Sequence, residues 1–82
     1  MFHKITELKP LPNLRLWARF EGGDARLYDL APLQERWDVF ASLSTVPGLF
    51  ALAHTDAGGR GVVWNDDIDL SSDEIWTNGV PA

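Results

Sequence analysis

The chain has no cysteine and only two histidines, so it lacks the side chains that make disulfides and thiolate zinc sites. Its 82 residues are expected to form one small domain, residues 1–82. Such a domain buries only about 60–65% of the surface that its unfolded chain exposes. Packing of the four Trp and four Phe residues must therefore supply much of the stability. Self-association is the other remedy for a small core, so a homodimer or a protein partner is expected.

Long apolar runs are also missing. No segment approaches the roughly 20 apolar residues of a membrane-spanning helix, and the first residues lack the apolar stretch of a signal peptide. We therefore expect a soluble cytoplasmic protein with no membrane partner. The net charge of −5 disfavours nonspecific binding of nucleic acid, which depends on an excess of Lys and Arg. Five of the seven basic residues nevertheless fall in the first third, and acidic residues crowd the last third.

Period-two alternation of apolar residues predicts the first strands. Residues 4–8 are expected to form a strand that Pro10 and Pro12 bring to an end. Residues 14–20 and 25–30 are expected to form the next two. Within the second strand, four apolar residues point to one face, and two arginines with a tryptophan point to the other.

The sequence Gly22-Gly23 predicts a hairpin between the second and third strands. Two successive glycines suit a two-residue loop, in which both residues take positive φ. Such a loop sets the register, so that Trp17 faces Tyr28 and Arg19 faces Arg26 on one side of the hairpin. Aromatic cross-strand pairs are stabilising, whereas two like charges directly opposed need solvent or a bound anion between them.

A single helix is predicted next. Pro32 suits its first turn, where the missing N–H costs nothing, and apolar residues recur at helical spacing through Leu43. Pro47 and the glycine after it break this pattern. Residues 49–55 and 62–65 then resemble two strands joined by a glycine-rich turn.

A second helix signal stands near the carboxyl end. Ser71 and Glu74 form the pattern of a capping box, in which the Ser71 hydroxyl bonds the Glu74 N–H and the Glu74 side chain reaches back. A short helical turn with Ile75 and Trp76 should follow. The predicted fold class is therefore α+β: a small, mainly antiparallel sheet of two hairpins, with one helix between them and a short C-terminal helical turn.

Several segments occur in an ordered set along the chain: residues 14–20 with their glycine turn, 26–30, Gly61-Val62-Val63-Trp64, Asp67-Ile68-Asp69-Leu70 and 73–75. This set resembles the bacterial domain-of-unknown-function 2442 (DUF2442) family. The resemblance implies a small α+β module with no established activity and no agreed catalytic residues. Some similar domains are encoded beside a second small protein, as in toxin–antitoxin pairs. Where the family often has a turn-like glycine this chain has Arg36-Trp37-Asp38, so a longer helix is expected.

The main candidate binding surface is the predicted face with Trp17, Arg19, Arg26 and Tyr28, because arginine and large aromatic residues are enriched in binding hot spots. Two structural alternatives stay open. A guanidinium could pack on Trp17 through a cation–π contact. The helix could also lie across this face and bury both rings as core while the arginines reach the solvent.

The carboxylates of Asp67, Asp69 and Asp73 are candidate metal ligands, because they alternate along the chain as the first ligands of a calcium loop do. Ser72 and Asn78 stand where such a loop requires glycine and glutamate. The alternative is a solvated acidic turn before a capped helix, whose N-terminus favours acidic side chains. No metal or other cofactor is predicted.

The histidines offer little support for catalysis. His54 should lie on an apolar strand opposite Val63, where a histidine is usually structural, and no serine or threonine is tied to a base by its spacing. The sequence is compatible with three functions. A noncatalytic protein-interaction or regulatory module, with an antitoxin-like version, is preferred. The alternatives are a nucleic-acid-associated regulator that uses the basic first third, and a metal-dependent hydrolase that combines the C-terminal aspartates with His54.

Overall fold

Three strands near the start of the chain and one near its end form a four-stranded antiparallel sheet in the computed structural model, which describes residues 3–82. Its strands are β1 (Ile5–Leu11), β2 (Arg15–Phe20), β3 (Ala25–Asp29) and β7 (Val80–Pro81). They lie in the order β1-β2-β3-β7, so the last strand returns to the edge of the first sheet.

The segment between β3 and β7 forms a smaller antiparallel sheet and the helices. The sheet has the order β4-β5-β6 and contains β4 (His54–Thr55), β5 (Gly61–Asn65) and β6 (Ile68–Ser71). The helical elements are α1 (Ala31–Arg36), α2 (Asp38–Thr45), the 3₁₀ turn η1 (Phe50–Leu52) and α3 (Ser72–Asn78). The predicted α+β class with antiparallel strands is confirmed. Within the described residues, no helix combines the length and the apolar character needed to cross a membrane.

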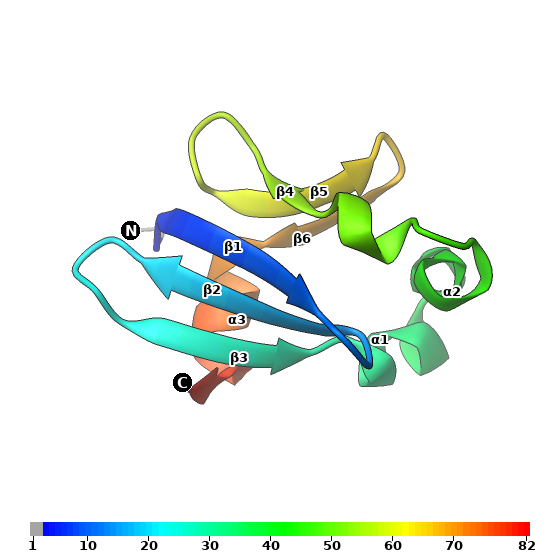
Figure 1. Cartoon of the computed structure of the whole chain (residues 1–82), viewed down its shortest axis with the longest axis horizontal. Helices are drawn as coiled ribbons and strands as arrows, with labels where there is room; N and C mark the ends of the chain where they lie inside the picture. The colour runs from blue at the N-terminus through cyan, green and yellow to red at the C-terminus, as the bar shows by residue number, and fades with distance from the viewer. Residues whose placement is uncertain (1–2) are drawn as a thin grey trace.

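The core lies between the two sheets and the helices. Figure 1 shows α3 behind β2 and β3, the second sheet above them, and α1 and α2 at one end. The inner face of β2 contributes Leu16, Ala18 and Phe20, all essentially inaccessible to solvent, as the predicted alternation requires. Trp64 of β5 packs edge-to-face on Phe40 and donates its indole N–H to the Phe50 carbonyl at 3.2 Å.

The first strand is longer than predicted. It continues past Pro10, which pairs with Leu16, and ends at Leu11. β1 is the outermost strand of its sheet, where a residue without an N–H is tolerated. The expectation that Pro10 ends the strand was therefore wrong.

The predicted register of the hairpin is also wrong: it differs from the observed register by one residue. The observed pairs are Trp17 with Leu27, and Arg19 with Ala25. The loop has three residues, 21–23, because the Phe20 N–H donates to the Asp24 carbonyl at 2.7 Å and the Gly23 N–H donates to the Phe20 carbonyl at 2.9 Å. Both glycines keep the predicted positive φ. A shift of one residue moves every side chain of the returning strand to the other face of the sheet.

The predicted single helix is two helices. Trp37 has an extended backbone (φ −136°, ψ 121°) and stands between α1 and α2, so the expected longer helix is not formed. A straight helix would place Leu33, Trp37 and Phe40 on one stripe. The break lets Leu33 and Phe40 remain buried while the Trp37 ring lies at the surface.

The predicted strand over residues 49–55 is reduced to His54–Thr55. Its first part folds as η1, which stacks the Phe50 ring on Trp64 at 6.1 Å between centroids. The pairing of His54 with Val63 is confirmed.

One half of the capping box predicted at the start of the last helix is confirmed. The Ser71 hydroxyl accepts the Glu74 N–H at 3.1 Å and begins α3. The Glu74 carboxylate turns to other donors: it accepts the Tyr28 hydroxyl at 2.9 Å and the Asn78 amide at 2.8 Å. The bond from Tyr28 ties α3 to the inner face of β3, and the bond from Asn78 lies within α3.

Candidate functional site

One face of the four-stranded sheet is not covered by a helix. The α3 helix bonds β3 through Tyr28, which marks the inner face, and Figure 1 views the sheet from the opposite side. On this outer face the registers align Lys9 with Trp17, Trp17 with Leu27, and Leu27 with Val80. Paired residues point to the same side of a sheet, so these four form one row across it. We call this row, with the flanking Arg15 and Arg19, the Trp17 face.

The Trp17 ring lies between two cations. The Lys9 ammonium is 5.0 Å from the ring centroid, and the Arg19 guanidinium carbon is 5.2 Å from it. Both distances fall within the range of cation–π attraction, which is worth about 0.5–1 kcal/mol at exposed sites. The ring itself is half buried, and Leu27 beside it is also half buried. The row thus combines an oriented aromatic ring with apolar area on a rigid sheet.

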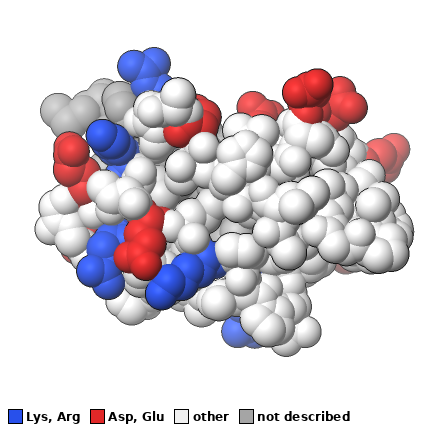
Figure 2. All heavy atoms as spheres, turned by 45° about the horizontal axis from the view of Figure 1, so that its top comes forward, with Lys and Arg blue, Asp and Glu red and all other residues white. Residues whose placement is uncertain are grey.

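The Trp17 face is locally basic. Its neighbouring pairs are Glu7 with Arg19 and Arg15 with Asp29. Together with Lys9 they give three basic and two acidic residues, on a chain whose net charge is −5. The 3.5 Å ion pair between Lys9 and Glu7 is solvent-exposed, and such pairs contribute little to stability. Figure 2 shows Lys and Arg side chains interspersed with Asp and Glu on one side of the molecule, whereas a broad area on the other side has no charge.

Arg26 and Tyr28 do not belong to this surface. The register shift places both on the inner face, so the predicted four-residue patch is divided into two pairs. The Arg26 guanidinium lies 4.1 Å from the Trp76 ring centroid, and its Nε donates to the Trp76 carbonyl. Tyr28 is buried, and burial, followed by its hydrogen bond to Glu74, raises the pKa of its phenol. Burial as core therefore describes Tyr28, and the cation–π alternative is observed at Trp17, on which Arg19 packs. Only Trp17 and Arg19 stay together on the outer face.

The acidic residues proposed as metal ligands do not converge. Among residues 3–82, no three His, Cys, Asp or Glu side chains are grouped so that they could hold a metal ion. Asp67 lies in the turn before β6 and Asp69 in β6, while Asp73 is in the first turn of α3. The Asp73 carboxylate accepts the His3 backbone N–H at 2.8 Å and lies 3.0 Å from the His3 ring nitrogen. These contacts lower the pKa of Asp73.

A cluster that the sequence did not indicate joins the two ends of the chain. The His3 ring stacks on Trp76 with centroids 4.1 Å apart and planes at 7°, and Arg26 packs on the same indole. The other histidine, His54, bonds the nearby Leu52 carbonyl at 3.0 Å. The His3 partners lie about 70 residues away, so no local spacing could reveal them.

A groove of about 590 Å³ lies where β3, α1 and α3 meet. The Tyr28 hydroxyl, Glu74 and Asn78 line it and bond one another, and Arg15 and Arg36 stand in its wall. A second groove of about 440 Å³ continues past Arg36 toward Trp37. Glu74 accepts from both Tyr28 and Asn78, so these three groups have a structural role in joining and bracing α3.

Comparison with known proteins identifies the family. A family described as "Protein of unknown function (DUF2442)" matches residues 5–81, which is nearly the whole chain. Comparison with curated proteins and with solved structures gave no match. The resemblance expected from the sequence is confirmed, and it brings no assigned active site.

Proposed function

The chain belongs to the DUF2442 family, and from this premise we propose that it is a noncatalytic protein-interaction module that binds an acidic partner through the Trp17 face. The observation that carries the proposal is the position of the Trp17 ring on an uncovered sheet face, between Lys9 and Arg19. A regulatory role, including an antitoxin-like one, is a form that such binding would take.

Side-chain chemistry supports this use of the Trp17 face. Trp and Arg dominate binding hot spots, and they act best where their neighbours exclude water. Leu27 lies beside Trp17, and Val80 extends the row with an exposed apolar side chain. A partner that covers this row buries apolar area at its centre and meets cations at its rim, which is the usual anatomy of a protein interface.

Charge supports an acidic partner. Lys9, Arg15 and Arg19 give the face a local excess of positive charge, while the rest of the chain is negative. An acidic segment is attracted to this face and repelled elsewhere, so the charge pattern orients the encounter. Binding should weaken as salt rises, because salt screens these exposed charges.

A tryptophan between two cations would also suit a base and its phosphates, so a nucleic-acid-associated regulator is the second candidate. The protein partner is preferred because the row continues from Trp17 into the apolar side chains of Leu27 and Val80, which suit the apolar centre of a protein interface. The whole-chain charge of −5 also opposes a polyanion such as nucleic acid more strongly than it opposes a single acidic segment.

The test compares two Trp–Arg pairs of the same composition on different surfaces. Trp17→Ala/Arg19→Ala removes the proposed hot spot. Trp37→Ala/Arg36→Ala is the matched control, because Arg36 packs 4.7 Å from the centroid of the exposed Trp37 ring. Wild type and each tagged variant are expressed in the organism that the protein comes from. Proteins that co-purify with the tagged chain in stoichiometric amounts are identified and then purified for titration.

The expected result is a purified acidic protein that binds wild type and the control pair alike. The Trp17/Arg19 variant should bind it at least about 30-fold more weakly, since a hot-spot residue contributes about 2 kcal/mol or more. A partner whose affinity is unchanged in that variant contradicts the proposal. Retention of a single-stranded oligonucleotide through Trp17, with no protein partner, would assign the face to nucleic acid instead.

A further inference from the structure

A long segment in the middle of the chain carries no charge. Between Asp38 and Asp56, residues 39–55 include no Asp, Glu, Lys or Arg, although 23% of the chain is charged. In the fold this segment supplies nearly all of α2 and then η1, which lie together toward one end of the molecule (Figure 1), and it continues into β4, which pairs with β5 in the second sheet. We call its solvent-accessible surface the neutral face.

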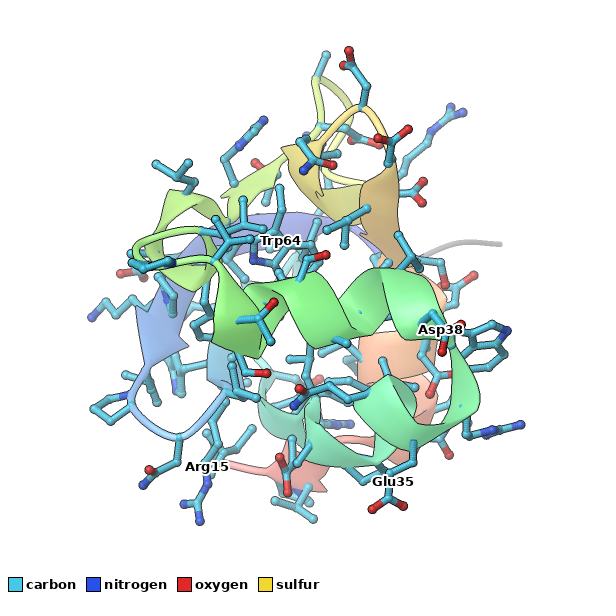
Figure 3. All side chains as sticks on the ribbon, turned by 90° about the vertical axis from the view of Figure 1, so that its right-hand side faces the viewer. Arg15, Glu35, Asp38 and Trp64 are labelled. Carbon is cyan, nitrogen blue, oxygen red and sulfur yellow. The ribbon has the colours of Figure 1, made fainter. Side chains whose placement is uncertain are left out.

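Figure 3 looks onto this end of the molecule. The α2 helix crosses the front of the view, and the labelled charged residues Arg15, Glu35 and Asp38 lie around its margin. The broad uncharged area of Figure 2 covers the same end. Charged residues therefore lie around the neutral face, and none of its own residues is charged.

Apolar side chains project from the neutral face. Three of the five large apolar residues that are exposed within the described chain lie on it: Val39 (38%), Val46 (48%) and Leu52 (61%). Val39 lies in the first turn of α2, and Val46 is the residue that follows its last turn. The Leu49 N–H donates to the Val46 carbonyl, and the Leu52 N–H to the Leu49 carbonyl, which keeps the η1 residues next to the end of α2.

Most residues of the neutral face are accessible to a second copy. Of its seventeen residues only Phe40 and Leu43 are buried; the others are exposed or half buried.

We propose that the neutral face is a homodimer interface, in which two copies of the chain meet around a twofold axis. A chain with a net charge of −5 repels its own copy wherever acidic surfaces meet. The neutral face is where two copies can approach without bringing like charges together, and a small core gains stability from the added burial. A membrane surface fits less well, because interfacial helices carry Lys or Arg beside their apolar face.

This interface is separate from the Trp17 face. Trp17 and its cations lie on the outer side of β1–β3, whereas the neutral face is built by α2 and η1. A dimer formed in this way presents two Trp17 faces, and a partner with two acidic segments would gain avidity from binding both.

The test is the mass in solution by sedimentation equilibrium over a wide range of protein concentration. Wild type should approach twice its monomer mass of 9.2 kDa. Val46→Glu/Leu52→Glu should remain monomeric, because each copy would bury two unpaired carboxylates in the interface. The control Ala57→Glu/Thr77→Glu adds the same charge at exposed positions outside the neutral face and should still dimerise.

Salt separates this proposal from the proposed function. Association through the neutral face should tighten or stay constant as salt rises, because salt screens the repulsion between two negative chains. Binding through the Trp17 face should weaken. A wild type that stays monomeric at every concentration overturns the dimer, and so does a Val46→Glu/Leu52→Glu variant that stays dimeric and folded by circular dichroism. Neither result changes the outcome expected for Trp17→Ala/Arg19→Ala.

Discussion

Gly59 links the two sheets, and its replacement by alanine tests that link. The residue lies in the turn between β4 and β5, and its carbonyl accepts the Ile5 N–H at 2.8 Å, so the smaller sheet is bonded to the start of β1. Gly59 has φ +68°, and a Cβ added to it would lie 2.6 Å from the Ile5 carbonyl oxygen. Gly59→Ala therefore strains its own backbone and also pushes against the backbone of β1.

These two effects set the size of the expected loss in the free energy of unfolding. A left-handed conformation costs a non-glycine residue about 1–2 kcal/mol, and the 2.6 Å contact with a backbone atom adds to this cost because β1 cannot simply rotate away. We expect Gly59→Ala to lower the free energy of unfolding by at least about 2 kcal/mol. In a domain of this size, 1 kcal/mol shifts Tm by roughly 4–8 °C, so the loss should be about 8–16 °C.

Gly58→Ala is the matched control. Gly58 is the preceding residue of the same turn, its φ is not positive, and an added Cβ would meet only the flexible Arg60 side chain at 3.5 Å. Its free energy of unfolding should stay within about 0.5 kcal/mol of wild type. Both variants are measured by urea and thermal unfolding with Trp fluorescence. Equal stabilities for the two alanine variants would refute the claim that the turn is held against β1.

Three further predictions concern the contacts of α3. Tyr28→Phe should lower the free energy of unfolding by about 1 kcal/mol, because it removes the bond to Glu74. The raised pKa of Tyr28 also gives wild type stability that is lost as pH rises above the ordinary value of 10.0. The stability of the variant, measured by unfolding at alkaline pH, should therefore depend less on pH. The contacts of Asp73 with His3 stabilise wild type above pH 3.8, and wild type loses this stability as pH falls below that value. Asp73→Asn should lack this stability at neutral pH, and its Tm should change less than that of wild type when thermal unfolding is repeated in acid. Ser71→Ala should lower the unfolding free energy by about 1 kcal/mol, and an unchanged value would argue against the cap.

The sequence predicted local structure best where one physical rule dominated. Alternation along residues 14–20 identified the buried face of β2, and the serine before α3 identified its cap. Both features depend on residues within a few positions of one another. The α+β class followed from the order of such elements.

The errors arose where long-range contacts decided between local alternatives. Gly22 and Gly23 allow both a two-residue and a three-residue loop, and burial of Tyr28 against Glu74 requires the register with the longer loop. Helical spacing continued through Trp37, but packing of Phe40 on Trp64 favours a break there. No pattern in the sequence encodes these contacts.

Only two of the four residues of the candidate surface were predicted correctly, because the position of the other two depends on contacts that are distant in the sequence. Trp17 and Arg19 lie on one strand, so the pleat alone keeps them together. Arg26 and Tyr28 belong to the next strand, and their face depended on the loop length. Lys9 became part of the surface only through the pairing of β1 with β2, which the sequence did not establish beyond Leu8.

Calorimetric titration of the purified partner tests most directly whether the Trp17 face binds an acidic protein. Wild type, Trp17→Ala and the control Trp37→Ala are titrated at low and at high salt. We predict that the Trp17 variant alone loses at least about 30-fold in affinity, and that wild-type binding weakens at high salt. Equal affinity of wild type and Trp17→Ala would contradict the claim.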